Sequence, residues 1–236
     1  MGVSDKTHTA NKDMRPLLIT IDGPAGAGKT TVGRMLADRL SYTYVDTGAL
    51  YRAVALEVHT RNIDPGDDIA LKHLCDGLQL KLVRENTGLR LLLNGRDVSG
   101  RIRTPEITML ASAVSARPVV RQCLLDLQRQ LGRKRSAVFE GRDMGTVVFP
   151  DADVKFYLDA SPKIRAYRRY TELKAKTSQT LDEVEKDLIC RDKNDSSRRA
   201  APLRPADGSI RIDATDMTAA QVVEAMLAHI NKLARM

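Results

Sequence analysis

The sequence predicts an α/β fold in which a parallel sheet is flanked by helices. Short apolar runs of strand length alternate along the chain with longer segments of helical periodicity, and this order is typical of parallel sheets. A glycine-rich turn joins the first apolar run to the first helical segment. Strands are expected at residues 17–21, 42–46, 137–140, 154–159 and 209–213.

The helices are predicted from apolar spacing and from capping residues. After the glycine-rich turn, Val32, Leu36 and Leu40 recur at helical spacing. Thr104 followed by proline, and Thr180 followed three residues later by glutamate, are patterns that begin helices. Further helix starts are expected near residues 118, 162 and 218.

Residues 77–100 interrupt the alternation of strands and helices. Leucines at 78, 80 and 82 alternate with other residues, a turn is expected at 86–88, and leucines at 89, 91 and 93 alternate again. This pattern predicts a small antiparallel hairpin, which is an insertion in a simple doubly wound sheet.

A second interruption spans residues 161–205 and is mainly helical. Residues 191–199 are so polar that we expect a mobile helix end or loop there, outside the core. Five Lys and Arg residues lie between positions 191 and 204. Their like charges favour an open segment until an anionic ligand binds.

Length and composition limit the class of protein. The 236 residues are 42% hydrophobic and 29% charged, as in a globular protein with one large domain or two small ones. No apolar run approaches the ~18 residues of a membrane span. Residues 1–15 lack the apolar centre of a signal peptide, and we expect a flexible tail there. The three cysteines are expected to be free thiols in a reducing cytoplasm.

Positive charge is concentrated in two parts of the chain. The net charge is +8; residues 90–135 carry ten Lys or Arg against three Asp or Glu, and residues 161–204 carry twelve against seven. This excess suits a polyanionic ligand. For most of these side chains, a solvated basic surface is the simpler explanation.

The glycine-rich turn at residues 23–30 matches the phosphate-binding pattern G-x-x-x-x-G-K-[ST] without a mismatch. Glycines let the backbone approach a phosphate closely, and the helix that follows directs its positive end toward the same anion. We expect Lys29 to reach the β- and γ-phosphates of ATP and the Thr30 hydroxyl to bind Mg²⁺. A GTPase is disfavoured because the guanine-reading pattern Asn-Lys-x-Asp is absent from the sequence.

Two further segments carry an arginine close to a glycine at the carboxyl end of a predicted strand. Residues 46–52 contain Arg52, and residues 140–150 contain Arg142. Ligands of open α/β sheets bind at these strand ends. For a lone arginine the structural explanation is favoured, which is a helix surface for Arg52 and a loop salt bridge for Arg142. Two such segments beside a phosphate-binding loop favour a binding site.

At these motifs the chain resembles the bacterial-type cytidylate kinases of the nucleoside monophosphate kinase superfamily. The resemblance spans residues 17–233 and rests on four motifs. They are the phosphate-binding loop, Asp-Thr-Gly-Ala-Leu-Tyr-Arg at 46–52, Gly-Arg-Asp-Met-Gly-Thr-Val-Val-Phe-Pro at 141–150 and Arg-Asp-x-x-Asp-x-x-Arg at 191–198. The third motif is highly specific to that family. Thr47 stands where the family commonly has Ser, and Glu140 where it commonly has Asp.

The resemblance implies roles for the residues that match the family's motifs. ATP binding is implied for Gly23, Pro24, Ala25, Gly26, Ala27, Gly28, Lys29, Thr30 and Thr31. CMP binding is implied for Thr47, Arg52, Ser112, Arg121, Arg142, Asp143, Arg191, Asp195 and Arg198. Within that set, the residues implied to bind the CMP phosphate are Thr47, Arg52 and Arg142. Those implied to bind the cytosine ring are Ser112, Arg121 and Asp143. Arg191 and Asp195 are implied to lie near the ribose. Catalytic roles are implied for Lys29, Arg142, Arg191 and Arg198.

The resemblance also implies a P-loop kinase core with an acceptor-binding insertion that contains the hairpin, and a helical lid. The expected division is a tail at 1–15, core at 16–46, acceptor-binding segment at 47–132, core at 133–160, lid at 161–204 and core at 205–236. The implied reaction is transfer of the γ-phosphoryl group of ATP to CMP, with dCMP as a second acceptor and Mg²⁺ accompanying ATP. We expect a cytoplasmic monomer with no nucleic-acid or membrane partner.

The chemistry of two residues agrees with a cytosine ligand. A carboxylate such as Asp143 can accept a hydrogen bond from the cytosine N4 amino group, and a guanidinium such as Arg121 can donate to N3 or O2. Uracil has a carbonyl oxygen in place of the N4 amino group, so it would face the Asp143 carboxylate with a second acceptor. Its N3 carries a hydrogen, so it would face the Arg121 guanidinium with a second donor. Phosphoryl transfer depends mainly on positioning and on neutralising negative charge, for which arginines are well suited.

Two alternatives remain open from the sequence. Another small P-loop kinase would act on a different nucleotide or on a metabolite such as shikimate, but the motif at 141–150 is not expected in those enzymes. A basic nucleic-acid-binding protein with an ATP switch is the alternative outside enzymes. Such a protein would be expected to have more aromatic residues for stacking on bases than the few in this sequence. The acidic stretch at 64–68 is better explained by a turn and a capped helix than by a metal site.

Overall fold

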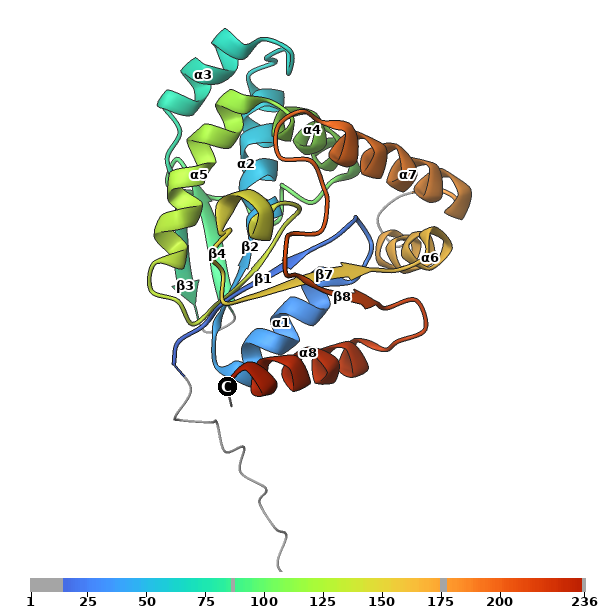
Figure 1. Cartoon of the computed structure of the whole chain (residues 1–236). Helices are drawn as coiled ribbons and strands as arrows, with labels where there is room; N and C mark the ends of the chain where they lie inside the picture. The colour runs from blue at the N-terminus through green and yellow to red at the C-terminus, as the bar shows by residue number, and fades with distance from the viewer. Residues whose placement is uncertain (1–14, 86–87, 175–177, 235–236) are drawn as a thin grey trace, which may run out of the picture.

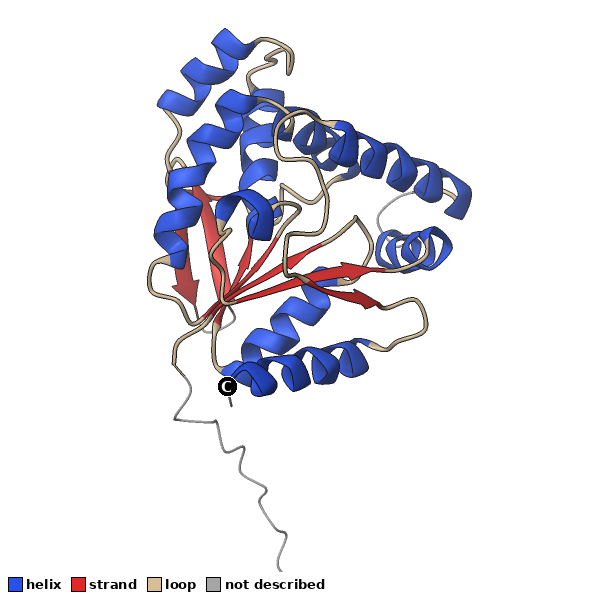
Figure 2. Cartoon of the chain, viewed as in Figure 1, coloured by secondary structure: helices blue, strands red, loops and turns tan. Residues whose placement is uncertain are grey.

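A computed structural model describes residues 15–85, 88–174 and 178–234. The tail predicted at residues 1–15 therefore lies, except for Arg15, outside the described residues. Figures 1 and 2 show a twisted sheet with helices on both sides. Among the described residues, no helix combines the length and the apolar character that crossing a bilayer requires. The cysteines are free thiols, as expected.

The main sheet is parallel and has the strand order β2-β6-β1-β7-β8. Its strands are β1 (Leu18–Asp22), β2 (Thr43–Asp46), β6 (Ala137–Glu140), β7 (Val154–Asp159) and β8 (Ile210–Asp213). All five predicted strands are confirmed, each within one residue at either end. The register aligns Glu140 with Ile21 on one side and with Asp46 on the other, so the carboxyl ends of β1, β6 and β2 lie side by side.

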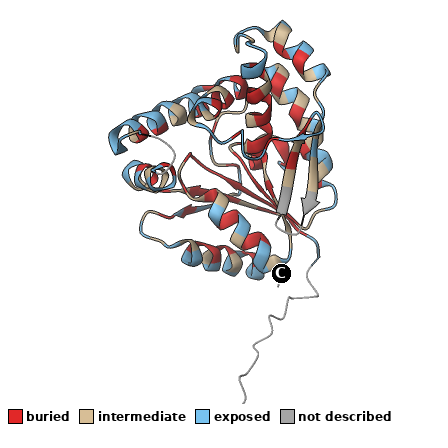
Figure 3. Ribbon diagram, turned by 180° about the vertical axis from the view of Figure 1, so that it is seen from behind, coloured by how far each residue is buried: buried red, intermediate tan, exposed pale blue. Residues whose placement is uncertain are grey.

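Two helices cover one face of the main sheet. α1 (Lys29–Leu40) and α8 (Ala219–Ala234) pack together below it in Figure 1. They bury Leu36 and Met226 against Ile19 and Phe156 of the sheet, and all four side chains are at most 1% exposed. Figure 3 shows the consequence, since the strands are largely buried whereas the outer helix faces are exposed.

The other face of the sheet carries a short π-helix that the sequence did not predict. This element, η1 (Met144–Val148), follows β6 after a bend and lies within the Gly-Arg-Asp motif region. Below it, Phe139 and Phe149 contact edge to face with ring centroids 4.6 Å apart. Single π-helical turns recur at functional sites because they redirect side chains locally.

The insertion between β2 and β6 has an apolar core of its own. It consists of α2 (Thr47–Thr60), α3 (Asp68–Asp76), β3 (Leu80–Glu85), β4 (Gly88–Leu93), β5 (Arg96–Asp97), α4 (Pro105–Ser115) and α5 (Pro118–Gly132). Antiparallel pairing of β3 with β4 confirms the predicted hairpin, and β5 adds a short third strand. Leu50, Leu71 and Leu124 belong to the cluster that joins these elements.

The helix starts follow the predicted capping residues. The Asp67 carboxylate accepts from the amides of residues 69 and 70, which confirms the turn and capped helix at 64–68. Thr104 accepts from the amide of residue 107 at 3.2 Å. Thr180 and Glu183 form a complete capping box, so the predicted capping signals at 104 and 180 are confirmed.

The lid segment, residues 161–204, forms a helical hairpin of α6 (Pro162–Leu173) and α7 (Leu181–Ser197). Residues 191–197 form the end of α7, as expected, but the expectation that the whole run at 191–199 lies outside the core is wrong at two positions. The helix continues to Ser197, and both Asp195 and Arg198 are buried. Burial is possible because these charges meet opposite charges from other segments. The boundaries expected between core, acceptor-binding segment and lid stay predictions.

Phe139→Ala should lower the free energy of unfolding by about 3–5 kcal/mol, because it leaves a cavity at the centre of β6. Urea unfolding followed by circular dichroism measures this change. Ile69→Ala, at a side chain that is 74% exposed, is the control and should cost less than about 0.5 kcal/mol. A loss below about 1 kcal/mol at Phe139 would contradict the packing described.

Candidate active site

A cavity of about 820 Å³ opens at the carboxyl ends of the parallel strands. Its walls come from the glycine-rich loop with α1, from the insertion together with the loop after β6, and from the lid helices. In the order of the sheet, β2 and β6 lie on one side of β1, and β7 and β8 lie on its other side. A site beside β1 therefore lies where ligands of open α/β sheets usually bind.

The shape of the glycine-rich loop requires glycine at three positions, 23, 26 and 28, where φ is positive. Gly23 has φ 147°, and a Cβ there would lie 1.9 Å from the carbonyl oxygen of Leu158. Gly28 has φ 95° and precedes the first residue of α1. The free amides at this helix start and the positive end of the helix together suit an anion.

The Lys29 ammonium is buried beside this loop without a full counter-charge. Lys29 is 6% exposed, and its Nζ donates to the Pro24 carbonyl oxygen at 2.6 Å. Removal from water and the nearby Arg142 guanidinium lower the pKa of Lys29 to about 7, although Glu140 opposes the shift. An anion bound in the loop would again favour the charged form.

Thr30 and Glu140 place two oxygen ligands at the start of α1. Thr30 Oγ1 donates to Glu140 Oε1 at 2.9 Å, and Glu140 is 7% exposed. Burial and the Asp46 carboxylate raise the pKa of Glu140. A hydroxyl beside a carboxylate is a donor set that Mg²⁺ prefers, so these residues fit the expected ion. In the part of the chain that is described, no group of three or more His, Cys, Asp or Glu forms a metal site by itself.

The Asp46 carboxylate holds two arginines at the wall of the cavity. Its Oδ2 accepts from Arg52 Nη2 at 2.8 Å and from Arg103 Nη2 at 3.4 Å. Burial alone would raise the pKa of Asp46, but the two guanidinium groups lower it overall. Thr47 begins α2 directly after Asp46, and its hydroxyl donates to the Glu140 carbonyl oxygen at 2.6 Å. The strand end thus positions two cations and one hydroxyl.

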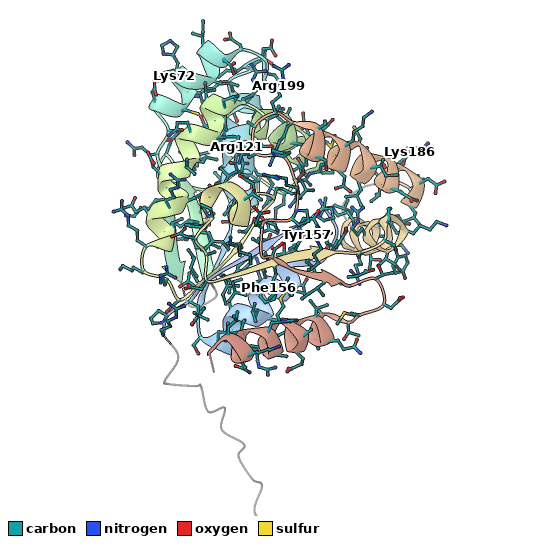
Figure 4. The ribbon with its side chains drawn as sticks, viewed as in Figure 1. Lys72, Arg121, Phe156, Tyr157, Lys186 and Arg199 are labelled. Atoms are coloured by element: carbon teal, nitrogen blue, oxygen red, sulfur yellow. The ribbon has the colours of Figure 1, made fainter. Side chains whose placement is uncertain are left out.

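Arg121 and Asp143 form an ion pair in the wall opposite the glycine-rich loop. Arg121, labelled in Figure 4, reaches from α5 and donates to Asp143 Oδ2 and to the Ser115 carbonyl oxygen. The guanidinium carbon also lies 5.6 Å from the ring centroid of Tyr51. Burial raises the pKa of Asp143, and the neighbouring arginines only partly oppose the rise.

The end of α7 contacts the acceptor side of the cavity. Asp195 Oδ2 accepts from Arg142 Nε at 3.0 Å, and Asp195 Oδ1 lies 3.5 Å from the Ser112 hydroxyl that donates to it. Arg198 Nη1 donates to Ser115 Oγ at 3.2 Å. Burial alone would raise the pKa of Asp195, but three neighbouring arginines lower it overall. The lid helix is thereby tied to the loop after β6.

Arg191 brings a poorly compensated charge into the same cavity. Its Nε has no hydrogen-bond partner among the described residues. Removal from water and the Arg142 guanidinium lower the pKa of Arg191 to about 9, although Asp195 opposes the shift. The group remains charged at neutral pH, so its charge opposes folding of the ligand-free protein.

The cavity as a whole is strongly cationic. Nine Lys or Arg residues line it against five Asp or Glu, counted over the described residues. A concave surface of one sign attracts ligands of the opposite sign and raises their local concentration. The arrangement therefore suits two phosphorylated ligands, one at each loop.

The structure brings the residues predicted for the two nucleotides together around one cavity. Residues 25–31 of the predicted ATP site line the cavity, whereas Gly23 and Pro24 do not. The predicted CMP residues that line it are Thr47, Arg52, Ser112, Arg121, Arg142, Asp143, Arg191, Asp195 and Arg198. Their individual roles stay predictions.

Several other residues of the cavity wall were not given a role from the sequence. They include Tyr51, Arg103, Glu140, Tyr167, Arg168 and Met217. Glu140 had a usable signal, because it ends a predicted strand beside the phosphate loop. Arg168 had none, because it donates to the carbonyl oxygens of Ala214 and Met217 at 2.7 and 3.3 Å, which lie far away in sequence.

Comparison with known proteins gives one consistent family. A family model described as cytidylate kinase matches residues 19–232. A cytidylate kinase of Syntrophotalea carbinolica is 50% identical over 214 residues, which cover 90% of this chain and 91% of that protein. A cytidylate kinase of Geobacter sulfurreducens is 50% identical over 213 residues, with coverage of 90% and 91%.

A solved structure of similar fold comes from Eubacterium ventriosum, where the protein is described as uncharacterized. It has a TM-score of 0.50 and 12% sequence identity, covering 92% of this chain and 99% of that chain. At this identity the likeness concerns the fold alone.

Arg191→Met should raise the melting temperature of the ligand-free protein by about 2–4 °C, which is roughly 1 kcal/mol for a chain of this size. The folded-state pKa of Arg191 lies below its ordinary value, so the charged group costs stability at all pH values below about 9. Differential scanning calorimetry at pH 7 measures the gain. Arg199→Met, at the exposed Arg199 labelled in Figure 4, is the matched control and should leave the temperature unchanged. A lower melting temperature for Arg191→Met would contradict this electrostatic account.

Proposed function

The chain belongs to the cytidylate kinase family, and on that premise we propose how its cavity performs the family's reaction. The enzyme is a phosphotransferase that moves the γ-phosphoryl group of ATP to CMP, giving ADP and CDP. One observation carries the proposal. The glycine-rich loop after β1 and the Gly-Arg-Asp loop after β6 face the same cavity, and Lys29 of the first lies close enough to Arg142 of the second for their charges to interact.

The glycine-rich loop is the proposed site of the ATP phosphates. Its amides and the start of α1 would bind them, and Lys29 would add a positive charge whose cost in the free protein disappears when the phosphates arrive. Arg168 and the exposed ring of Tyr167 line the cavity at the end that α6 forms. We assign the donor base to that end, because flat guanidinium and aromatic surfaces favour stacking.

Thr30 and Glu140 are the residues that we assign to Mg²⁺ entering with ATP. When bound, the ion neutralises charge on the β- and γ-phosphates. The hydrogen bond between the two side chains at 2.9 Å keeps both oxygens at the start of α1 before the nucleotide arrives. Lys29 then supplies the further positive charge from the other side of the loop.

The acceptor side divides into a phosphate region and a base region. Arg52 and Arg142 are proposed for the CMP phosphate, since guanidinium groups bind phosphate through two parallel hydrogen bonds. Arg121 and Asp143 are proposed for the cytosine ring, with Ser112 beside them. The attacking CMP phosphate oxygen is already an anion, so the reaction requires positioning and charge neutralisation rather than a general base.

The lid segment is proposed to close over both nucleotides and to exclude water from the γ-phosphoryl group. Asp192 of α7 accepts from the Ala25 amide of the glycine-rich loop at 3.3 Å, and Asp195 accepts from Arg142. The lid thus contacts both phosphate-binding loops, which supports coupling between nucleotide binding and lid position. Arg191 and Arg198 are the cations that the two nucleotides would attract.

Several finer expectations accompany this function as predictions. They are the use of dCMP, a ribose contact of Asp195, a monomeric state, a cytoplasmic location and the absence of nucleic-acid and membrane partners.

An ATP-coupled assay across the nucleoside monophosphates tests the function. CMP and dCMP should be phosphorylated, and UMP should have a kcat/KM lower by at least about tenfold, because its C4 and N3 groups mismatch the predicted partners. Lys29→Ala should reduce kcat with CMP at least about a hundredfold through loss of charge on the transferred group. The control is Lys72→Ala at an exposed lysine of α3, labelled in Figure 4, which should keep full activity. Full activity of Lys29→Ala would contradict the assigned ATP site.

Asp143→Ala and Arg121→Met should weaken CMP far more than ATP. Each removes a charge-assisted hydrogen bond worth roughly 1.5–3 kcal/mol, so KM for CMP should rise about ten- to a hundredfold while KM for ATP changes little. The preference for CMP over UMP should shrink in both variants. Steady-state kinetics with each nucleotide provide the measurement. Two variants with wild-type discrimination would show that the base is recognised elsewhere.

A further inference from the structure

Asp22 is a buried carboxylate for which the proposed reaction has no use. It is the last residue of β1, directly precedes Gly23 of the glycine-rich loop, and is 2% exposed. It does not line the cavity, so it is not placed to touch either nucleotide. Its position nevertheless lies between the two phosphate-binding loops.

The Asp22 side chain binds the start of η1 across the sheet. Its Oδ1 accepts from the Met144 amide at 2.8 Å, and its Oδ2 accepts from the Gly145 amide at 2.7 Å. These are free amides at the beginning of a helical turn, which must find an acceptor when they are buried. Asp22 therefore caps η1 from a neighbouring strand.

By sequence position the residue that should cap η1 is Asp143. Aspartate in the capping position usually turns its carboxylate back onto the first amides of its own helix. Here the Asp143 side chain makes no capping bond, and its backbone has φ −149° and ψ 24°. Its carboxylate instead meets the guanidinium groups of Arg121 and Arg198 in the cavity.

These two observations share the Gly145 amide, because a capping aspartate accepts from the second or third amide of its own helix. If Asp22 did not accept from Gly145, the Asp143 carboxylate could cap η1 in the usual way, and turning toward that amide would take it out of the cavity. We propose that Asp22 is a positioning residue for acceptor recognition, because its capping of η1 leaves the Asp143 carboxylate facing the cavity. The inference rests on the proposed role of Asp143 toward the cytosine ring.

The charge state of Asp22 is compatible with this role. Burial raises the pKa of Asp22 to about 6, and the two amide bonds oppose the rise. At an assay pH of about 8 the carboxylate is therefore ionised, so both oxygens accept. An asparagine in its place offers one acceptor oxygen, and its amino group would face the second backbone N–H.

Asp22→Asn is the test, measured by steady-state kinetics with CMP, UMP and ATP. KM for CMP should rise about tenfold and the CMP-over-UMP ratio of kcat/KM should fall by a similar factor, as for loss of one charge-assisted hydrogen bond. KM for ATP should change less than KM for CMP, since the Asp22 carboxylate makes its hydrogen bonds to η1 and acts on Lys29 only through its charge. A residue that only supported the fold would not change the selectivity between two acceptors.

Asp153→Asn, at the residue that directly precedes β7, is the matched control. Asp153 is also a buried carboxylate that accepts a backbone amide of β1, that of Leu18 at 2.7 Å, but it lies at the opposite end of the strand. Its loss should lower the melting temperature and leave the CMP-over-UMP ratio unchanged. A loss of selectivity in Asp153→Asn equal to that in Asp22→Asn would overturn the inference.

A double-mutant cycle separates this inference from the proposed function. If Asp22 acts through Asp143, then Asp22→Asn should change KM for CMP less than about twofold in the Asp143→Ala background. If the fold-changes in KM for CMP of the two single variants multiplied in the double variant, the inference would be overturned. Unchanged selectivity in Asp143→Ala alone would overturn the proposed role of Asp143 and this inference with it, whereas unchanged selectivity in Asp22→Asn alone would overturn only this inference.

Asp22→Ser provides a second variant, because its hydroxyl retains one acceptor in a smaller side chain. Circular dichroism first establishes that each variant is folded, and kinetics at 15 °C (about 10 °C below standard assay conditions) extend the usable range for a destabilised enzyme. Selectivity lost in the folded serine variant supports the inference. Failure of both variants to fold would make Asp22 a purely structural residue and would overturn it.

Discussion

The parallel pairing of β1 with β6 is the constraint on which the rest of the site depends. Its register places Ile21 beside Glu140, and the Gly141 amide continues the ladder by donating to the Ile21 carbonyl oxygen at 3.1 Å. The glycine-rich loop and the Gly-Arg-Asp loop therefore leave the sheet side by side. Every later feature uses this proximity, from the Thr30–Glu140 bond to the Asp22 contacts with η1.

The cationic cavity has opposite effects on ligand binding and on folding. Its positive charges favour phosphorylated ligands, but they destabilise the ligand-free protein. Burial and like charges lower the pKa values of Lys29 and Arg191, so the ligand-free protein holds charges that its own surroundings disfavour. Asp46, Asp143 and Asp195 offset part of this repulsion by pairing with arginines. Phosphate groups would supply the rest, which links ligand binding to stability.

The sequence was sufficient where a signal is local and insufficient where partners come from distant segments. Strands, caps and phosphate motifs are local, and they were predicted closely. Asp22 carries no local sign of its role, because its partners lie more than 120 residues away. The burial of Asp195 in the polar run at 191–199 was not predicted for the same reason, because Arg142, which pairs with it, belongs to another segment. The π-helix also escaped, because it depends on the bend that Asp22 stabilises.

The insertion between β2 and β6 has its own apolar core and joins the main sheet through only two chain connections, one at Asp46–Thr47 and one after α5. The apolar core of the insertion can therefore change its packing without disturbing the separate core between the main sheet and helices α1 and α8. Donor binding and the part of acceptor recognition that the insertion supplies are then separable parts of one polypeptide, whereas Arg142 and Asp143 remain in the loop after β6. Grafting a different insertion between the same two strand ends would be the natural route by which such a scaffold acquires a new acceptor during evolution.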